Sequence, residues 1–127
     1  MVDDTIYSVL VADAALVALR GQRLYPLEAP QDSLEPYQTY VRVSDVPWTV
    51  LDGTIVFREA RYQISCYATN RRDARAMAEA TITALHEYRA GDIKLARFEN
   101  LMESVEPDIG SNGQSLYHVA ADFMVTS

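Results

Sequence analysis

The chain has 127 residues, a net charge of −7 and a single cysteine, Cys66. This length predicts one domain, residues 1–127, large enough to bury one hydrophobic core. The acidic balance argues against nucleic-acid binding, because affinity for phosphates depends on basic side chains. A lone cysteine excludes a disulfide within the chain and fits a reducing compartment.

The first residues, MVDDTIYSVL, carry two acids where a secretory signal needs basic residues. No apolar run approaches the roughly 20 residues that span a membrane. We therefore expect a protein that is made in a cytoplasm and has no membrane partner.

Residues 3–21 are expected to be helical, because apolar side chains recur every three or four residues once a break near Asp13 is allowed. Asp13 has two readings: it caps a second short helix, or it is a solvated acid in the middle of one helix. Gly21 is a plausible end for the helical region, since glycine accepts the conformation that commonly follows a helix.

Three of the five prolines lie in the connection that follows, residues 23–36. Each proline lacks an N–H donor and drives the preceding residue towards extended backbone. Helix is thereby excluded and a central strand is disfavoured. We expect this connection to run extended over the surface.

From Tyr37 the pattern changes to the period of two that is typical of a strand. Asp52 and Gly53 then stand between two apolar segments, and Asp-Gly is a strong signal for a hairpin turn. The second segment continues to Thr69. The sequence therefore predicts a long antiparallel pair of strands with an apolar tip. We call the tip, residues 46–56, the arm.

The clearest helix is expected over residues 71–88, with Asn70 as its N-cap and Gly91 as its stop. One stripe of this helix is apolar or small, as expected for a helix that packs on a sheet. The stripe consists of Ala74, Met77, Ala78, Thr81, Ile82, Leu85 and Tyr88.

Two further strands complete the chain. Residues 93–109 alternate imperfectly and suggest a bulged strand, residues 110–115 form a turn, and residues 116–126 alternate regularly. The resulting order, α(α)-β-β-α-β-β, predicts an α+β fold. We expect a mainly antiparallel four-stranded sheet with the helices packed on one face.

Candidates for chemistry are few. His86 falls in the last turn of the long helix, and His118 alternates with core residues and so should face away from the core. Cys66 lies between apolar neighbours on a strand, where a cysteine acts as a small hydrophobe. No nucleotide-binding loop or metal-spaced cluster occurs. We predict no catalytic residue, no cofactor and no metal.

The unusual feature is the apolar character of the arm. An apolar patch on a projecting segment usually marks a protein interface. The alternative is that the arm folds back over its own sheet. The side chains concerned are Trp48, Val50, Leu51, Ile55 and Val56.

The chain resembles the tail terminator or tail-completion proteins of long-tailed bacteriophages, which include head-to-tail joining proteins, and their prophage and gene-transfer-agent relatives. The resemblance runs almost end to end, although no single motif is specific and the segment SDVPWTVLDG falls outside it. It is carried by four ordered segments: IYSVLVADAALVALRGQRLYP, APQDSLEPYQTYVRVS, RYQISCYATNRRDARAMAEATITAL and SLYHVAADFMV.

This resemblance implies a structural virion protein rather than an enzyme. Such a protein forms a ring, commonly a hexamer, that caps the tail tube at its head-proximal end and presents a surface to the head-tail connector. Its partners would be other copies of itself, the tube protein and the connector protein, and it would reside in the host cytoplasm before assembly. Arg23 and Arg42 are then expected to pair with carboxylates of the next subunit.

Two alternatives remain at this point. The first is a monomeric regulatory or binding module built on a similar sheet. The second is a small enzyme with Cys66 or His118 in a pocket, which requires catalytic partners that the sequence does not show.

Overall fold

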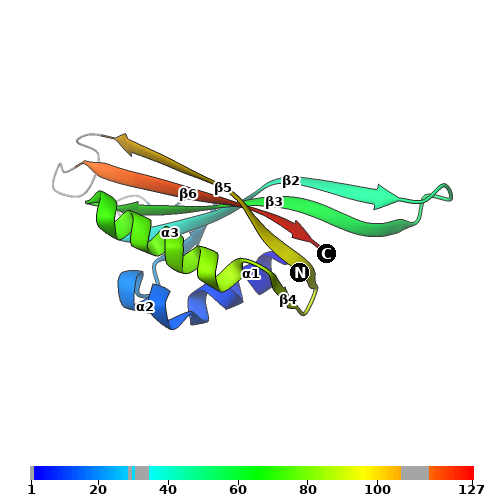
Figure 1. Cartoon of the computed structure of the whole chain (residues 1–127), viewed down its shortest axis with the longest axis horizontal. Helices are drawn as coiled ribbons and strands as arrows, with labels where there is room; N and C mark the ends of the chain where they lie inside the picture. The colour runs from blue at the N-terminus through cyan, green and yellow to red at the C-terminus, as the bar shows by residue number, and fades with distance from the viewer. Residues whose placement is uncertain (1, 29, 31–34, 107–114) are drawn as a thin grey trace.

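The computed structural model describes residues 2–28, 30, 35–106 and 115–127. Within those ranges Figure 1 shows helices gathered on one side of a twisted sheet, from which one hairpin projects. The elements in chain order are α1 (Val2–Ala12), α2 (Ala14–Arg20), β1 (Leu24–Pro26), β2 (Tyr37–Thr49), β3 (Ile55–Ala68), α3 (Arg71–Leu85), β4 (Tyr88–Ala90), β5 (Ile93–Glu106) and β6 (Leu116–Thr126).

The sheet has six strands in the order β1-β2-β3-β6-β5-β4. The α+β class is confirmed, and the long strands β2, β3, β5 and β6 are antiparallel neighbours as predicted. The four-stranded count is wrong, because β1 and β4 add one short strand at each edge. β1 pairs with β2 in parallel, so the sheet is mixed. Three residues are too few to show a period of two, which is why neither strand was predicted.

The core lies between the helices and one face of the sheet. Alternate residues of β3 and β6 point into it, as the period of two requires. α3 packs on this face through the predicted Met77 and Leu85, both buried, with Ile82 partly buried beside them. The largest buried apolar side chains from the other elements are Ile6, Leu10, Leu16, Tyr62, Ile64, Val119, Phe123 and Val125.

The structure settles the role of Asp13. Its carboxylate accepts a hydrogen bond from the backbone N–H of Leu16 at 3.1 Å, so Asp13 caps a separate second helix. That helix ends at Gly21, whose φ of +64° lies in the left-handed region that glycine adopts at little cost. Both predicted signals at this end of the molecule are confirmed.

α3 begins as predicted and ends earlier. The Asn70 side chain accepts from the N–H of Asp73 at 2.8 Å and caps the helix. The helix stops at Leu85 rather than Tyr88, because Tyr88 pairs with Ala96 and starts β4. Gly91 does not end the helix; it has a φ of +60° and lies in the turn between β4 and β5. The pairing with β5 thus overrides the helical pattern at this point.

Part of the connection after α2 is extended as predicted and forms the edge strand β1, whereas Leu27 directly after it has a φ of +64°. Residues 29 and 31–34 of this connection lie outside the described residues. Residues 107–109 of the strand predicted over 93–109 and residues 110–114 of the predicted turn also lie outside them.

A buried polar network ties the helices to the sheet. Arg20 is fully buried and donates from Nε to Gln38 Oε1 on β2 at 2.5 Å. It also donates to the carbonyl oxygens of Leu10 at 2.8 Å and Gly21 at 2.6 Å. Gln38 continues the network by donating to Thr81 Oγ1 on α3 at 2.7 Å. Burial lowers the pKa of Arg20.

Candidate functional site: the arm and its root

The arm is formed by the far ends of β2 and β3. β6 pairs with β3 only as far as Glu59, whereas the β2–β3 ladder continues to the pair Thr49 and Ile55. Figure 1 shows this hairpin extending well past the other strands. The alternative in which the arm folds back over its own sheet is therefore wrong.

The tip of the arm is the predicted Asp-Gly turn. The Asp52 carboxylate accepts from the N–H of Thr54 at 2.8 Å. Hydrogen bonding to the side chain of Thr54, and then to its backbone, lowers the pKa of Asp52. Gly53 has a φ of +89°, a conformation that other residues adopt only with strain. A backbone hydrogen bond of 3.0 Å from Val50 to Thr54 closes the turn.

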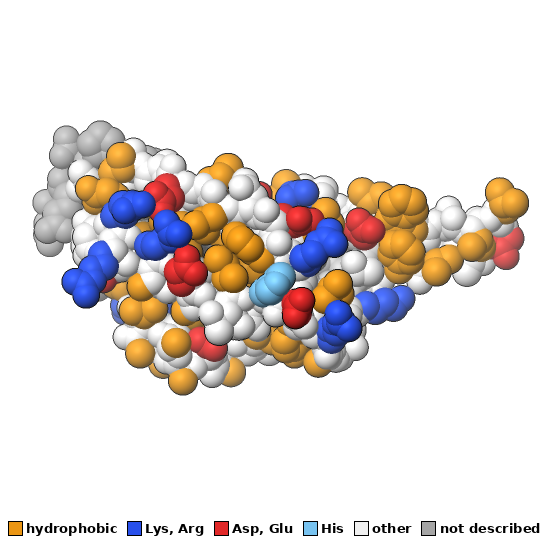
Figure 2. Space-filling view, viewed as in Figure 1, with side chains coloured by type: hydrophobic (Ala, Val, Ile, Leu, Met, Phe, Trp, Pro, Cys, Tyr) orange, Lys and Arg blue, Asp and Glu red, His pale blue; other side chains and the backbone are white. Residues whose placement is uncertain are grey.

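All five predicted apolar residues lie on the arm and are exposed. Trp48 and Val50 are 50% exposed, and Leu51 at the tip is completely exposed. Ile55 and Val56 are also about half exposed, and Figure 2 shows the hydrophobic side chains along the projecting hairpin. Exposed large apolar side chains on one element mark an interaction surface. Their contact with a partner stays a prediction.

Some of the apolar side chains of the arm form a strip on one face of the hairpin. Trp48 lies opposite Phe57 in the ladder, and their rings stack with centroids 5.7 Å apart. Val46 is two residues from Trp48 and points to the same side, because side chains alternate along a strand. This side is the face of the sheet that the helices leave open. The strip consists of Val46, Trp48 and Phe57, whereas Val56 points to the opposite side of the arm.

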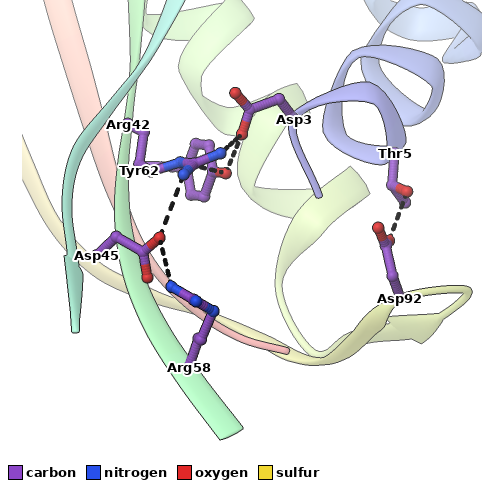
Figure 3. A network of polar contacts seen from close by, with 7 residues as sticks. All are labelled: Asp3, Thr5, Arg42, Asp45, Arg58, Tyr62 and Asp92. Atoms are coloured by element: carbon purple, nitrogen blue, oxygen red, sulfur yellow. Dashed lines mark hydrogen bonds and ion pairs between the residues drawn. The ribbon is translucent and has the colours of Figure 1, made fainter. Parts of the chain in front are cut away.

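The root of the arm is held by a network of charged and polar side chains, shown in Figure 3. Arg42 of β2 donates to Asp3 of α1 at 2.6 Å and to Asp45 at 3.2 Å. Arg58 on β3 approaches the same Asp45 carboxylate at 3.4 Å. The Tyr62 hydroxyl donates to Asp3 and accepts from Arg42 Nε at 3.1 Å. The first turn of α1 is thereby joined to both strands of the arm.

The network shifts the pKa values of its members. Burial acts to raise the pKa of Asp3, and hydrogen bonds from Tyr62 and Arg42 outweigh it, so that this pKa lies below its ordinary value. The hydrogen bond to Asp3 raises the pKa of Arg42, and burial together with Asp3 raises the pKa of Tyr62. The charged forms of Asp3 and Arg42 are thus the stable ones at neutral pH.

A second contact holds α1 on its other side. Thr5 Oγ1 donates to Asp92 Oδ1 at 2.6 Å, and Asp92 lies in the turn between β4 and β5. The start of α1 therefore contacts the arm root and the opposite sheet edge (Figure 3). The sequence pattern gave no signal for these contacts, because Asp3 and Tyr62 are 59 residues apart.

Arg23 and Arg42 were predicted to face a neighbouring subunit, and the structure gives both of them partners within the chain. Arg23 Nε donates to the carbonyl oxygen of Pro36 at 2.8 Å. Its backbone lies beside Gln38, at the end of β2 remote from the arm. Arg42 lies at the arm root, so the structure does not bring the two arginines together. Their pairing with another subunit stays a prediction.

The structure places each of the three candidates for chemistry in a different local environment. Cys66 is fully buried, and burial raises the pKa of its thiol to about 12. His86 Nδ1 accepts from the backbone N–H of Phe98 at 3.1 Å and thereby caps the sheet edge. His118 stacks on Tyr67 with ring centroids 4.5 Å apart, on the open face of the sheet as predicted. That the protein is not an enzyme nevertheless stays a prediction.

The described residues contain no group of three or more histidine, cysteine, aspartate or glutamate side chains placed to hold a metal ion. None of the helices in the described part of the chain is both long enough and apolar enough to cross a bilayer.

The structure is that of an α+β protein with helices on one face of a mixed sheet and an exposed apolar arm. Residues 4–126 match the sequence profile of the family described as tail completion protein gp17. The chain therefore belongs to this family and is a structural protein of a phage tail. The resemblance seen in the sequence is confirmed. No curated protein matches the chain significantly.

A solved structure shares the fold. One chain of the structure described as "Virion of native gene transfer agent (GTA) particle" superimposes with a TM-score of 0.65. The two chains are 20% identical, and the match covers 96% of this chain and 92% of that chain. At this identity the likeness shows a common fold over nearly the whole length of both proteins.

Proposed function

We propose that this protein forms a hexameric ring that caps the phage tail tube at its head-proximal end and presents a surface for joining the head. Membership of the tail completion family supports a role at the end of tail assembly. The particle origin of the structural neighbour supports a place in a virion. The partners there would be the tube protein and the connector protein. The protein would be in the host cytoplasm before assembly.

The exposed arm is the observation that carries the proposal. A tryptophan side chain buries on the order of 200 Å² in a contact, and tryptophan is a favoured anchor of protein interfaces. Trp48 is half exposed at the centre of a strip that the described part of the chain does not cover. We infer that this strip contacts the neighbouring subunit or the tube protein.

The root network makes the arm suitable for this task. A two-stranded hairpin is by itself only marginally stable in water. Here Arg42 and Arg58 link both strands through Asp45, and Arg42 ties them to α1. An arm that is already held in place loses less conformational entropy when it binds. Exposed ion pairs between subunits would add at most about 1 kcal/mol each, so the arm should dominate the contact.

The test removes the apolar surface of the arm without disturbing its turn. Trp48→Ala combined with Leu51→Ser should abolish rings of uniform diameter in electron microscopy. Light scattering should then report a single chain of 14.2 kDa rather than a multiple of it. In an induced or infected host, tails should be absent or overgrown.

A matched control alters the same arm but keeps its apolar strip. Thr49→Ser with Asp52→Asn changes two exposed polar residues, and we expect normal rings and normal tail lengths. If the Trp48 and Leu51 double variant is folded, forms rings and yields tails of normal length, the arm is not the interface. A protein that is monomeric at every concentration and is missing from particles would instead support a monomeric binding module.

A further inference from the structure

The sheet has two long edges that no described strand covers. On one side, β1 pairs with β2 only as far as Tyr40, so residues 41–49 of β2 pair with β3 alone. On the other side, β4 pairs with β5 only as far as Ala96, and His86 caps the N–H of Phe98. Residues 99–106 of β5 then pair with β6 alone. The two uncovered stretches have similar lengths and lie towards opposite ends of the sheet, because the ladders place Val41 level with Asn100. A neighbouring copy must therefore be displaced along the strand direction for the two stretches to meet.

The uncovered edge of β5 has a bulge between Phe98 and Asn100 and a regular ladder from Asn100 onwards. Natural proteins guard such edges with charged side chains, proline or bulges. Two carboxylates on this stretch are paired within the chain: Glu99 pairs with Arg97 at 3.0 Å, and Glu103 pairs with two arginines of α3 at 2.9 and 3.1 Å. Met102 and Val105 are each about half exposed. An edge of this kind favours the addition of another strand.

The uncovered edge of β2 has matching properties over its first part. Val43 and Val46 are each about half exposed and flank this edge with aliphatic surface. Pro47 follows, and its missing N–H is tolerated on an edge strand but interrupts a new ladder. The pairing surface on β2 is therefore residues 41–46, directly before the aromatic strip of the arm.

The direction of the strands decides how the two edges can meet. Each neighbour in the series β2, β3, β6, β5 is antiparallel to the next, so β2 and β5 run in opposite directions at opposite sides of the sheet. When one copy continues the sheet of another, β2 of the first meets β5 of the second in antiparallel orientation. The same head-to-tail contact repeats from copy to copy, and such a contact gives a ring when the rotation between copies closes.

We infer that residues 41–46 of β2 in one subunit pair with residues 99–105 of β5 in the next, so that the ring is joined by a continuous antiparallel sheet. This inference rests on the proposed ring and identifies the strands that join it. Pairing of β5 with β5 about a two-fold axis is disfavoured, because it would stop at a dimer and leave both β2 edges uncovered.

Disulfide trapping between variants that each carry one added cysteine tests the inference directly. Ser44 and Val46 on β2, and Met102 and Ser104 on β5, all point to the open face of the sheet, as their ladder partners show. Directly opposite residues in a new antiparallel ladder would be close enough for a disulfide. The native Cys66 is fully buried and should not react in the folded protein.

Each β2 variant is oxidised alone, each β5 variant is oxidised alone, and the two kinds are oxidised as an assembled mixture. We expect a linked dimer in at least one β2–β5 mixture and in none of the single variants. A chain carrying both cysteines of a productive pair should yield a series of linked multimers. Thr83→Cys, at an exposed position of α3, serves as a control that should not crosslink with any partner.

Three outcomes would overturn the inference. Linked dimers of a β5 variant alone would show β5–β5 pairing. Rings that form normally, without a crosslink in any β2–β5 mixture, would show that other surfaces join the subunits. In the second case the ring itself survives, so this failure is distinct from failure of the proposed function. If no rings form under any condition and the protein is missing from particles, both the proposed function and this inference are wrong.

Discussion

Two arginines show how differently the body and the arm of this protein are held. Arg20 is fully buried and bonds three neutral oxygen acceptors that join α1, α2 and β2. Arg42 lies nearer the surface and pairs with two carboxylates at the root of the arm. The first arginine belongs to a packed core and the second to a partly solvated charge network.

The difference shows where each region obtains its stability. The body buries apolar side chains on one face of the sheet, and the Arg20 network satisfies the polar groups trapped there. The arm buries almost nothing, and its position depends on contacts at its root. Its apolar strip therefore remains available to a partner, whereas the apolar surface of the body is already used.

The largest expected effect contrasts the same substitution in the two regions. Leu85→Ala removes a buried side chain that packs between α3 and the sheet, and it should lower the free energy of unfolding by about 2–5 kcal/mol. Leu51→Ala on the exposed tip should change it by no more than about 0.5 kcal/mol. Urea unfolding of both variants measures the contrast, and equal losses would contradict it.

A smaller effect is expected from Arg20→Met, which keeps much of the side-chain volume but removes the donors. Gln38 Oε1 and the carbonyl oxygens of Leu10 and Gly21 would lose their partner, at a cost of about 2–3 kcal/mol. Arg72→Met on the exposed face of α3 is the control and should be close to neutral. If Arg20→Met unfolds at the same urea concentration as the wild type, the network is not a source of stability.

The smallest effect concerns the arm root and depends on pH. The folded state lowers the pKa of Asp3 below its ordinary value of 3.8. Its contribution to stability is therefore present above this value and is lost as the pH falls through the folded pKa. Because the Asp3 carboxylate is 39% exposed, Asp3→Asn should cost at most about 1 kcal/mol at pH 7.

The difference in free energy of unfolding between Asp3→Asn and the wild type should shrink when the pH is lowered below about 4. Thr49→Ser, an exposed change on the arm that alters no charge, is the comparison variant, and its effect on stability should not depend on pH. Limited proteolysis at the arm root would report whether Asp3→Asn also loosens the arm. A loss of stability in Asp3→Asn that grows in acid would contradict the assigned role.

The sequence by itself determined the features that arise from local pattern. Apolar spacing located the helices, Asp13, Gly21 and Asn70 marked their ends, and alternation with the Asp-Gly turn located the arm. The apolar composition of the arm also pointed to the surface described here. Each of these signals lies within a few residues of the element that it defines, so the chain expresses it without reference to distant segments.

Only the tertiary structure decided the rest. β1 and β4 exist because long strands offer them an edge, and Tyr88 leaves the helical pattern in order to pair with Ala96. One partner of Arg42 is Asp3, which is 39 residues away in the sequence, and no local pattern indicates this pairing. The uncovered edges of β2 and β5 depend on the order of the strands, which local patterns do not encode. These features come from long-range contacts. Each contact contributes little energy by itself, and the contacts form only when the whole sheet has formed.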